Sequence, residues 1–319
     1  MAANPTPLSR LLRNPSAVED FCVFNGITHL EIELDESDES WAISPACPVI
    51  AVGDSHNPHP CADVIVDTRE ELRDIAQAIA ERPIASTMYV QLLRHNEKCS
   101  IDDALQAESL TYSTLQHCNE FLAWLKTRGG PVAEASDCDP VVLVERTGPV
   151  LELILNRPEK HNAWSSSMRD ALCEGLALSL EDRSIEHVRL RGNGPSFCSG
   201  GDLDEFGSAR DAGIAHVSRT VRNAGRLIEA LRDRVTVNVH GACIGAGIEV
   251  PSFSARVVSS PHAQFQLPEV RMGLVPGAGG TASMLRRIGR HRLAWMGLTG
   301  DRISAETALA WGLIDEIAN

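Results

Sequence analysis

Two glutamates stand in short segments whose other residues are mostly small or apolar. Glu249 closes the stretch GACIGAGIE, and Glu269 lies further along in QLPEV. A carboxylate in such surroundings is costly unless it has a partner or a task. Two carboxylates beside one small space can hold a water and divide acid and base roles, if their environments separate their pKa values. We therefore predict that Glu249 and Glu269 are catalytic.

Two glycine-rich loops each follow a predicted strand. They are FCSGGD, residues 197–202, and CIGAGIE, residues 243–249. Glycine allows tight turns and close approach of the backbone to a ligand. If both loops turn N–H groups toward one point, they form a site for an enolate or tetrahedral oxyanion. A helix that begins near Ala246 adds the positive end of its dipole.

Simpler interpretations of these features remain open. Glycine-rich loops after strands are often only turns, and Glu269 after Pro268 can act as a helix cap. Cys198 and Cys243 lie beside the loops, but no base at a nucleophile's spacing accompanies them. Packing is therefore favoured over covalent catalysis for the two thiols.

The elements that must position these residues alternate along the second half of the chain. Strands are predicted at VVLVER, VLELIL, HVRLRG, VTVNVHG and RVVSS, with the first two joined in a hairpin. Helices are predicted at residues 165–182, at 211–233, and twice more near the end, with a break at Gly300. Such alternation is typical of an α/β domain with a largely parallel sheet.

The first half of the chain has a different order of predicted elements, with strands first and helices after them. Strands are predicted at 30–34, 47–53 and 62–68, and the acidic DESDES, 35–40, is expected to be an exposed turn. Thr68 and Glu71 form a capping box before a helix that ends at Pro83. Helices are also predicted at 84–93 and about 101–128, with a break near 117–119, before a linker at 131–140. We therefore divide the chain into 1–135 and 136–319.

The composition of the chain argues against several classes of protein. The 319 residues carry a formal net charge of -14, which argues against a nucleic-acid partner. No apolar stretch approaches the length of a membrane span. The nine cysteines are scattered and odd in number, so they do not indicate a disulfide framework. A cytoplasmic protein is expected. HNPHPC, 56–61, offers three ligand-like side chains, but a fourth is lacking and no metal is expected.

The order and spacing of five motifs resemble those of the crotonase, or enoyl-CoA hydratase/isomerase, superfamily. The motifs are NRPEKHNAWS, FCSGGDLDEF, GACIGAGIEV, AQFQLPEVRMGLVPGAGGT and LTGDRISAETALAWGLIDEI. The resemblance covers residues 141–319. It implies an α/β fold in which ββα repeats form a spiral, here with an additional mixed, mostly helical N-terminal region. It implies an acyl-coenzyme A thioester as substrate, no further cofactor, and a homotrimer or hexamer.

The resemblance also assigns roles. Ser199 and Ala246 would supply the two oxyanion N–H groups. Glu249 would activate water, and Glu269 would exchange a proton at the α carbon. Residues expected to contact coenzyme A are Arg157, Lys160, Ala163, Gly200 and Asp202, although Arg157 and Lys160 fit a solvated loop equally well. Residues expected to line the substrate pocket are Trp164, Leu203, Gly245, Pro268 and Gly277.

The chain departs from the family pattern at its end. Family members continue past GLIDEI with helices that cover the site, whereas this sequence stops at Asn319. The segment 92–130 resembles those missing helices, so we expect the N-terminal region to supply the cap in permuted order. Presence of both glutamates favours an enoyl-CoA hydratase or dehydratase, although the acyl chain and the pathway cannot be read from the sequence. Double-bond isomerisation, other enolate chemistry, and a binding subunit with weak activity remain alternatives.

Overall fold

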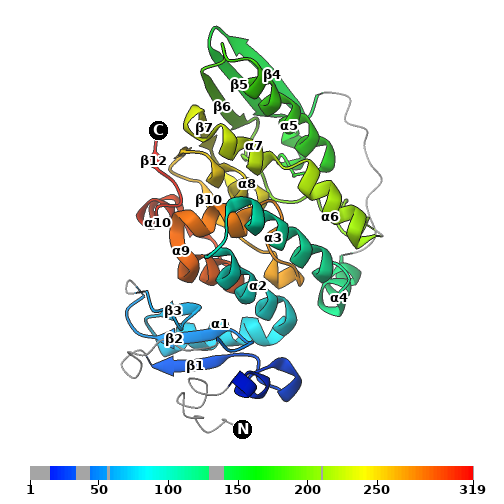
Figure 1. Cartoon of the computed structure of the whole chain (residues 1–319). Coiled ribbons are helices and arrows are strands. Elements are labelled where there is room, and N and C mark those ends of the chain that lie inside the picture. The colour runs from blue at the N-terminus through cyan, green and yellow to red at the C-terminus, as the bar shows by residue number, and fades with distance from the viewer. Residues whose placement is uncertain (1–14, 34–43, 56–57, 129–139, 210, 319) are drawn as a thin grey trace.

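The computed structural model describes residues 15–33, 44–55, 58–128, 140–209 and 211–318 (Figure 1). The predicted acidic turn at 35–40, His56 of the candidate metal motif, and most of the predicted linker lie outside these ranges. So does the predicted boundary at 135/136. Within the described residues, no helix is both long enough and apolar enough to cross a membrane.

The larger sheet forms the frame of the C-terminal half. Its strands are β4 (Val142–Thr147), β5 (Val150–Leu155), β6 (His187–Gly192), β7 (Val235–Val239), β9 (Arg256–Ser259) and β12 (Glu316–Ile317). The order is β12-β9-β7-β6-β5-β4, and every pair is parallel except the hairpin of β4 and β5. The predicted hairpin and largely parallel sheet are therefore confirmed.

A smaller sheet carries the two glutamate segments. Its strands are β8 (Ala242–Ile244), β10 (Gln264–Gln266) and β11 (Ile303–Ser304). β8 and β10 are parallel, with Cys243 opposite Phe265, so their carboxyl ends lie side by side. Ligand sites gather at the carboxyl ends of parallel strands because the loops that leave them open on one edge. Glu249 follows β8 and Glu269 follows β10, so this pairing brings both to the same edge.

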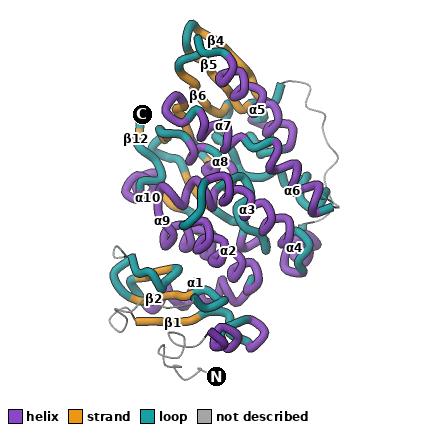
Figure 2. Tube along the Cα trace, viewed as in Figure 1, coloured by secondary structure: helices purple, strands orange, loops and turns teal. Residues whose placement is uncertain are grey.

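Helices cover these sheets (Figure 2). They are α5 (Ser166–Glu181), α6 (Ala212–Val221), α7 (Ala224–Ala230), α8 (Ala246–Glu249), α9 (Gly280–Thr299) and α10 (Ala305–Trp311). The helical segment predicted over 211–233 is present, but it is divided into separate helices. Asn223 separates α6 from α7, because its side chain accepts a hydrogen bond from the N–H of Arg226 and starts a new helix.

The N-terminal region builds a parallel sheet and a helical layer. The strands are β1 (Leu30–Glu33), β2 (Val49–Val52) and β3 (Val64–Val66). The helices are α1 (Arg69–Glu81), α2 (Pro83–Asn96), α3 (Ile101–Leu115) and α4 (Asn119–Thr127). The predicted cap is confirmed, since Thr68 accepts from the N–H of Glu71. The predicted break at 117–119 is also confirmed.

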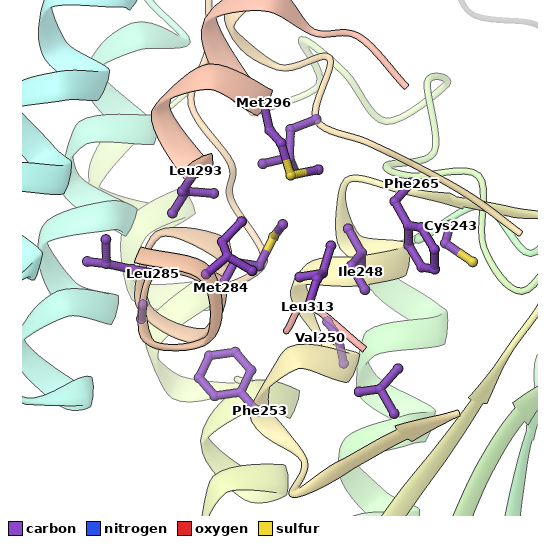
Figure 3. Close-up of a cluster of buried hydrophobic side chains, with 14 of the residues drawn as sticks. Cys243, Ile248, Val250, Phe253, Phe265, Met284, Leu285, Leu293, Met296 and Leu313 are labelled. Atoms are coloured by element: carbon purple, nitrogen blue, oxygen red, sulfur yellow. The ribbon is translucent and has the colours of Figure 1, made fainter. Parts of the chain in front are cut away.

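One hydrophobic core runs through both halves of the chain. It joins Leu93, Leu105 and Phe121 of the N-terminal helices to residues such as Phe253 and Met284. Figure 3 shows part of this core, where α9 packs on the segment after β8. In Figure 1, α3 lies between α9 and α6, and both pack against it. The N-terminal helices are therefore part of the body that carries the glutamates.

A buried ion network fastens the N-terminal sheet to α9. Asp63 is fully buried between Arg290 of α9 and Arg94 of α2. Its Oδ1 accepts from Arg290 Nη1 at 2.9 Å and from Arg94 Nε at 2.8 Å. Its Oδ2 accepts from the N–H of Val49 at 2.8 Å. A carboxylate with this many charged and polar partners is hard to replace.

We expect Asp63→Ala to lower the free energy of unfolding by about 3–5 kcal/mol, because it leaves buried guanidinium groups without their anion. Chemical denaturation measures this change. Glu33→Gln serves as the control, since Glu33 forms an exposed ion pair with Arg69 and its loss should cost below about 1 kcal/mol. Equal effects of the two changes would contradict the anchoring role of Asp63.

Candidate active site

Backbone pairing brings the two glycine-rich loops together. The N–H of Cys198 donates to the carbonyl of Ala242 at 3.1 Å, and the N–H of Ile244 donates to the carbonyl of Cys198 at 3.0 Å. The first loop is also paired with Trp164, whose N–H donates to the carbonyl of Gly200 at 2.8 Å and whose carbonyl accepts from Asp202 at 2.9 Å. Both loops therefore meet at the carboxyl end of β8.

Glu249 is buried, and the amino end of α9 holds its carboxylate. Glu249 Oε2 accepts from the N–H of Ala278 at 2.8 Å and from the N–H of Gly280 at 2.9 Å. Burial raises the pKa of Glu249 to about 7, although the backbone donors oppose the rise. A carboxyl group poised near neutral pH, with its ionised form supported by two amides, is suited to act as a base.

Glu269 has a different environment on the other side of Gly245. Its Oε2 is buried and makes no hydrogen bond with any described residue. Burial, followed by the nearby charge of Glu249, raises the pKa of Glu269 well above the ordinary value. A Cβ atom on residue 245 would lie 2.3 Å from Glu269 Oε1 and 3.7 Å from Glu249 Oε1. The backbone φ of Gly245 is 51°, in the region that favours glycine. Glycine at 245 therefore lets the two carboxyl groups share one space.

Two backbone N–H groups beside the glutamates have no acceptor among the described residues. They belong to Gly201 and to Ala246, the first residue of α8, and both residues line the same cavity as Glu249 and Glu269. The prediction of Ser199 as a donor is corrected here. Its N–H donates to the carbonyl of His161 at 3.0 Å and is already used inside the fold.

A third buried glutamate was not found from the sequence. Glu108 of α3 accepts from the N–H of Gly279 at 2.7 Å and from the N–H and hydroxyl of Thr281 at 2.9 and 2.6 Å. It thus takes the amides that alternate with those bound by Glu249. Burial, and then the charge of Glu249, raise the pKa of Glu108 to about 8. The only sequence signal was the likeness of 92–130 to a cap.

The cavity beside the glutamates has a volume of about 250 Å³. Trp164, Asp202 and Gly277 line it, in agreement with the residues predicted for this region. Of the other predicted pocket residues, Gly245 separates the two glutamates, whereas Leu203 is exposed and does not line the cavity. Pro268 does not line it either. The cavity is also lined by residues that the sequence analysis missed, from α6 and from α3 and its end: Tyr112, Gln116, Ser218 and Arg219.

The structure corrects the expected coenzyme A contact of Arg157, whereas that of Lys160 stays a prediction. Arg157 is buried, and its Nη1 donates to Asp202 at 2.9 Å and to the carbonyl of Ala163 at 3.1 Å. It therefore supports the loop from inside and does not face a phosphate. Lys160 is more exposed, and its Nζ lies 3.1 Å from Asp204. Lys160 can still reach a ligand, but it carries its own counter-ion.

The thiols beside the site are not nucleophiles. Burial raises the pKa of Cys198 to about 12 and that of Cys243 well above its ordinary value, so both stay protonated. In the part of the chain that the structure describes, no three His, Cys, Asp or Glu side chains group as metal ligands. His59 instead accepts at its carbonyl from His291 Nε2 at 2.9 Å.

Comparison with known proteins adds independent information. Residues 145–319 match the family described as "Enoyl-CoA hydratase/isomerase". A 2,3-dehydroadipyl-CoA hydratase of Escherichia coli K12 is 32% identical over 176 residues, 55% of this chain and 68% of that protein. A 1,2-epoxyphenylacetyl-CoA isomerase of the same organism is 34% identical over 175 residues, which cover 53% of this chain and 66% of that protein. An enoyl-CoA hydratase structure from Mycobacterium smegmatis has a TM-score of 0.52 at 30% identity. The match covers 56% of this chain and 70% of that structure.

We expect Glu108→Ala to lower the free energy of unfolding by roughly 2–4 kcal/mol, because it leaves buried amides of α9 unpaired. Asp102→Asn on the same helix is the control, since Asp102 is exposed and bonds Arg226 on the surface. Because the folded-state pKa of Glu108 is raised, its destabilising contribution grows as pH rises from about 4.5 towards 8. Glu108→Gln should flatten the wild-type loss of stability over that range in denaturation at several pH values. Equal slopes of unfolding free energy against pH in the wild type and in Glu108→Gln would contradict the raised pKa of Glu108.

Proposed function

Because this chain belongs to the enoyl-CoA hydratase/isomerase family, we propose that it adds water across the α,β double bond of an acyl-CoA thioester. The observation that carries the proposal is the pair of carboxyl groups at Gly245 with different surroundings. Glu249 is held by two amides, whereas Glu269 Oε2 has no partner among the described residues. Such a difference separates a base from an acid.

The thioester carbonyl oxygen is proposed to bind between the N–H groups of Gly201 and Ala246. Both donors line the cavity of the glutamates and are unpaired within the described structure. Their role is to stabilise the negative charge that develops on the oxygen as water adds. Because α8 starts at Ala246 but is a single turn, its dipole adds little to this.

The proton transfers follow from the two environments. The Glu249 carboxylate takes a proton from the water as the water oxygen bonds to the β carbon. The π electrons move to the thioester oxygen and give an enolate held by Gly201 and Ala246. Protonated Glu269 then donates its proton to the α carbon, and the carbonyl reforms. The reverse sequence dehydrates a 3-hydroxyacyl-CoA.

Isomerisation is the second candidate, and several relatives are named isomerases, among them an enoyl-CoA isomerase/hydratase. Moving a double bond needs a proton removed from one carbon and returned to another, and a single carboxyl group suffices for that. Two carboxyl groups around one space favour hydration. A thioester-binding subunit without turnover is a third possibility, and the experiment below distinguishes it.

The N-terminal region is proposed to act as the cap over the acyl group. Tyr112 of α3 and Gln116 at the end of that helix line the cavity, and α3 packs between α9 and α6. We further propose assembly into a homotrimer or hexamer. In support, Ile214, Val217 and Val221 of α6 are exposed at helical spacing and form an apolar stripe that a second subunit can cover.

We expect wild-type turnover on a panel of trans-2-enoyl-CoA thioesters, followed by loss of the conjugated enoyl absorbance. Glu249→Gln and Glu269→Gln should each lower kcat by at least about 10²-fold, because each removes a proton transfer. The kcat/KM should fall below about pH 7, where Glu249 becomes protonated. The matched control is Glu205→Gln, another carboxylate in the cavity wall, which binds the N–H and hydroxyl of Ser166.

Turnover that survives loss of either glutamate would overturn the assignment of both as proton carriers. Binding of thioesters without any consumption of water or shift of the double bond would favour the binding-subunit alternative. Conversion to the β,γ-unsaturated isomer without 3-hydroxyacyl product would favour isomerisation.

Ala246→Pro tests the proposed oxyanion site. Proline fits the first residue of a helix, so the change removes one N–H with little strain on α8. We expect kcat to fall by about 10²–10³-fold, as for loss of one oxyanion donor. Ala246→Gly, which keeps the N–H, is the control and should retain activity. Full activity in the proline variant, in steady-state assays, would exclude Ala246 as a donor.

A further inference from the structure

We propose that the acyl chain of the substrate ends in a second carboxylate and that Arg219 binds it. The inference rests on the proposed function, because it names the substrate class of the same pocket. Arg219 comes from α6 and lines the cavity together with Glu249 and Glu269. A cation in an acyl pocket is unfavourable for a plain hydrocarbon chain, so its presence there calls for an anionic group.

The Arg219 side chain is held in place by neutral groups of α3. Its Nε donates to the Ser109 hydroxyl at 3.2 Å, and its Nη2 donates to the Ser109 carbonyl at 3.4 Å and to the Ser113 hydroxyl. Its guanidinium carbon lies 4.7 Å from the centre of the Tyr112 ring. A guanidinium fixed by two serines and stacked on a ring is oriented before any ligand arrives.

In the part of the chain that the structure describes, the Arg219 guanidinium has no directly paired carboxylate, although the charge of Glu108 acts on it from further away. Among the described residues, no carboxylate lies within 4.0 Å of it, and its Nη1 makes no hydrogen bond. The other two arginines of the cavity differ in this respect. Arg169 lies 2.8 Å from Asp170, and Arg222 lies 3.4 Å from Glu174. Arg219 is therefore the cation of this wall with donors open to a ligand carboxylate.

Tyr112 sets Arg219 apart from the reacting carbons. A Cβ atom on Gly277 would lie 2.6 Å from the Tyr112 ring, so the ring packs directly on the loop that binds Glu249. Arg219 stacks on the same ring. The Tyr112 ring therefore contacts both the loop that binds Glu249 and the guanidinium of Arg219. In this proposal the ring lies between the reacting carbons and the carboxylate at the far end of the acyl chain.

Gln116 is a second unpaired polar group on this wall. It lies one turn after Tyr112, at the end of α3, and its Oε1 is buried without a partner among the described residues. An amide can turn to present its N–H₂ to an anion. An apolar chain end would leave the Gln116 amide and the Nη1 group of Arg219 without a polar partner, and sites built from unpaired polar groups reject such ligands strongly.

The test compares trans-2-hexenoyl-CoA with the thioester of the same length that ends in a carboxylate. For the wild type, we expect kcat/KM to be at least about tenfold higher for the carboxylate. Arg219→Gln should lower that value by roughly 10–100-fold and change the value for hexenoyl-CoA by less than about twofold. Arg226→Gln is the matched control. Arg226 of α7 also bonds α3, at Asp102, but does not line the cavity.

A wild type that prefers the methyl-ended thioester, or shows no preference, overturns the inference. So does an Arg219→Gln variant that lowers both values equally, which would make Arg219 a structural or coenzyme A contact. If Arg219→Gln does not fold, Arg219→Lys, which keeps the charge, should retain the preference.

Calorimetric binding of hexanoyl-CoA and adipyl-CoA separates the two proposals. Tighter binding of adipyl-CoA that depends on Arg219, without hydration, supports the substrate class while the proposed function fails. Hydration of hexenoyl-CoA without any carboxylate preference supports the proposed function and overturns the substrate class.

Discussion

The amino end of α9 is the point on which the site depends. Its successive amides are divided between two buried carboxyl groups, with Ala278 and Gly280 bound to Glu249 and Gly279 and Thr281 bound to Glu108. The first amides of a helix have no partner within it and favour negative charge. Glu249 uses them to keep its carboxylate oriented in an apolar setting. Glu108 uses them to fasten the N-terminal helices to the same place, so the two glutamates share one anchor.

This shared anchor links stability to chemistry. Glu249 and Glu108 each raise the cost of ionising the groups around them, and Glu269 lies in the same field. Carboxyl groups packed this closely titrate together, so the protonation state of one group shifts the pKa values of its neighbours. The pKa of Glu269 is raised well above its ordinary value, whereas the two amides bound to Glu249 favour its ionised form. Under the proposed function, these environments make an acid and a base from the same residue type.

The helix α3 gives the cavity much of its polar character. α3 and the residue that follows it contribute Glu108 to the anchor, Tyr112 and Gln116 to the cavity wall, and Ser109 and Ser113 to the seat of Arg219. Neighbouring members of this set are one, three or four residues apart, so one helix serves α9 and α6 at once. The family match begins at residue 145, so these contacts come from the part of the chain that the match leaves out. Under the proposed function, the N-terminal half contributes to selectivity by holding Arg219 of α6 in place and by adding Tyr112 and Gln116 to the cavity wall.

The sequence by itself determined the local features: the glycine-rich loops, the Thr68 cap, the β4–β5 hairpin, and the placing of Glu249 and Glu269 in apolar segments. These depend on residue types within a few positions, and spacing along the chain reveals them. Only the tertiary structure decided that Gly201 and not Ser199 has the open N–H, because the acceptor of Ser199 is the carbonyl of His161, distant in sequence. It also decided the places of Arg157, Glu108 and Arg219. Each of these depends on a partner at least 45 residues away in the chain, and such long-range contacts leave no periodic or local pattern to read.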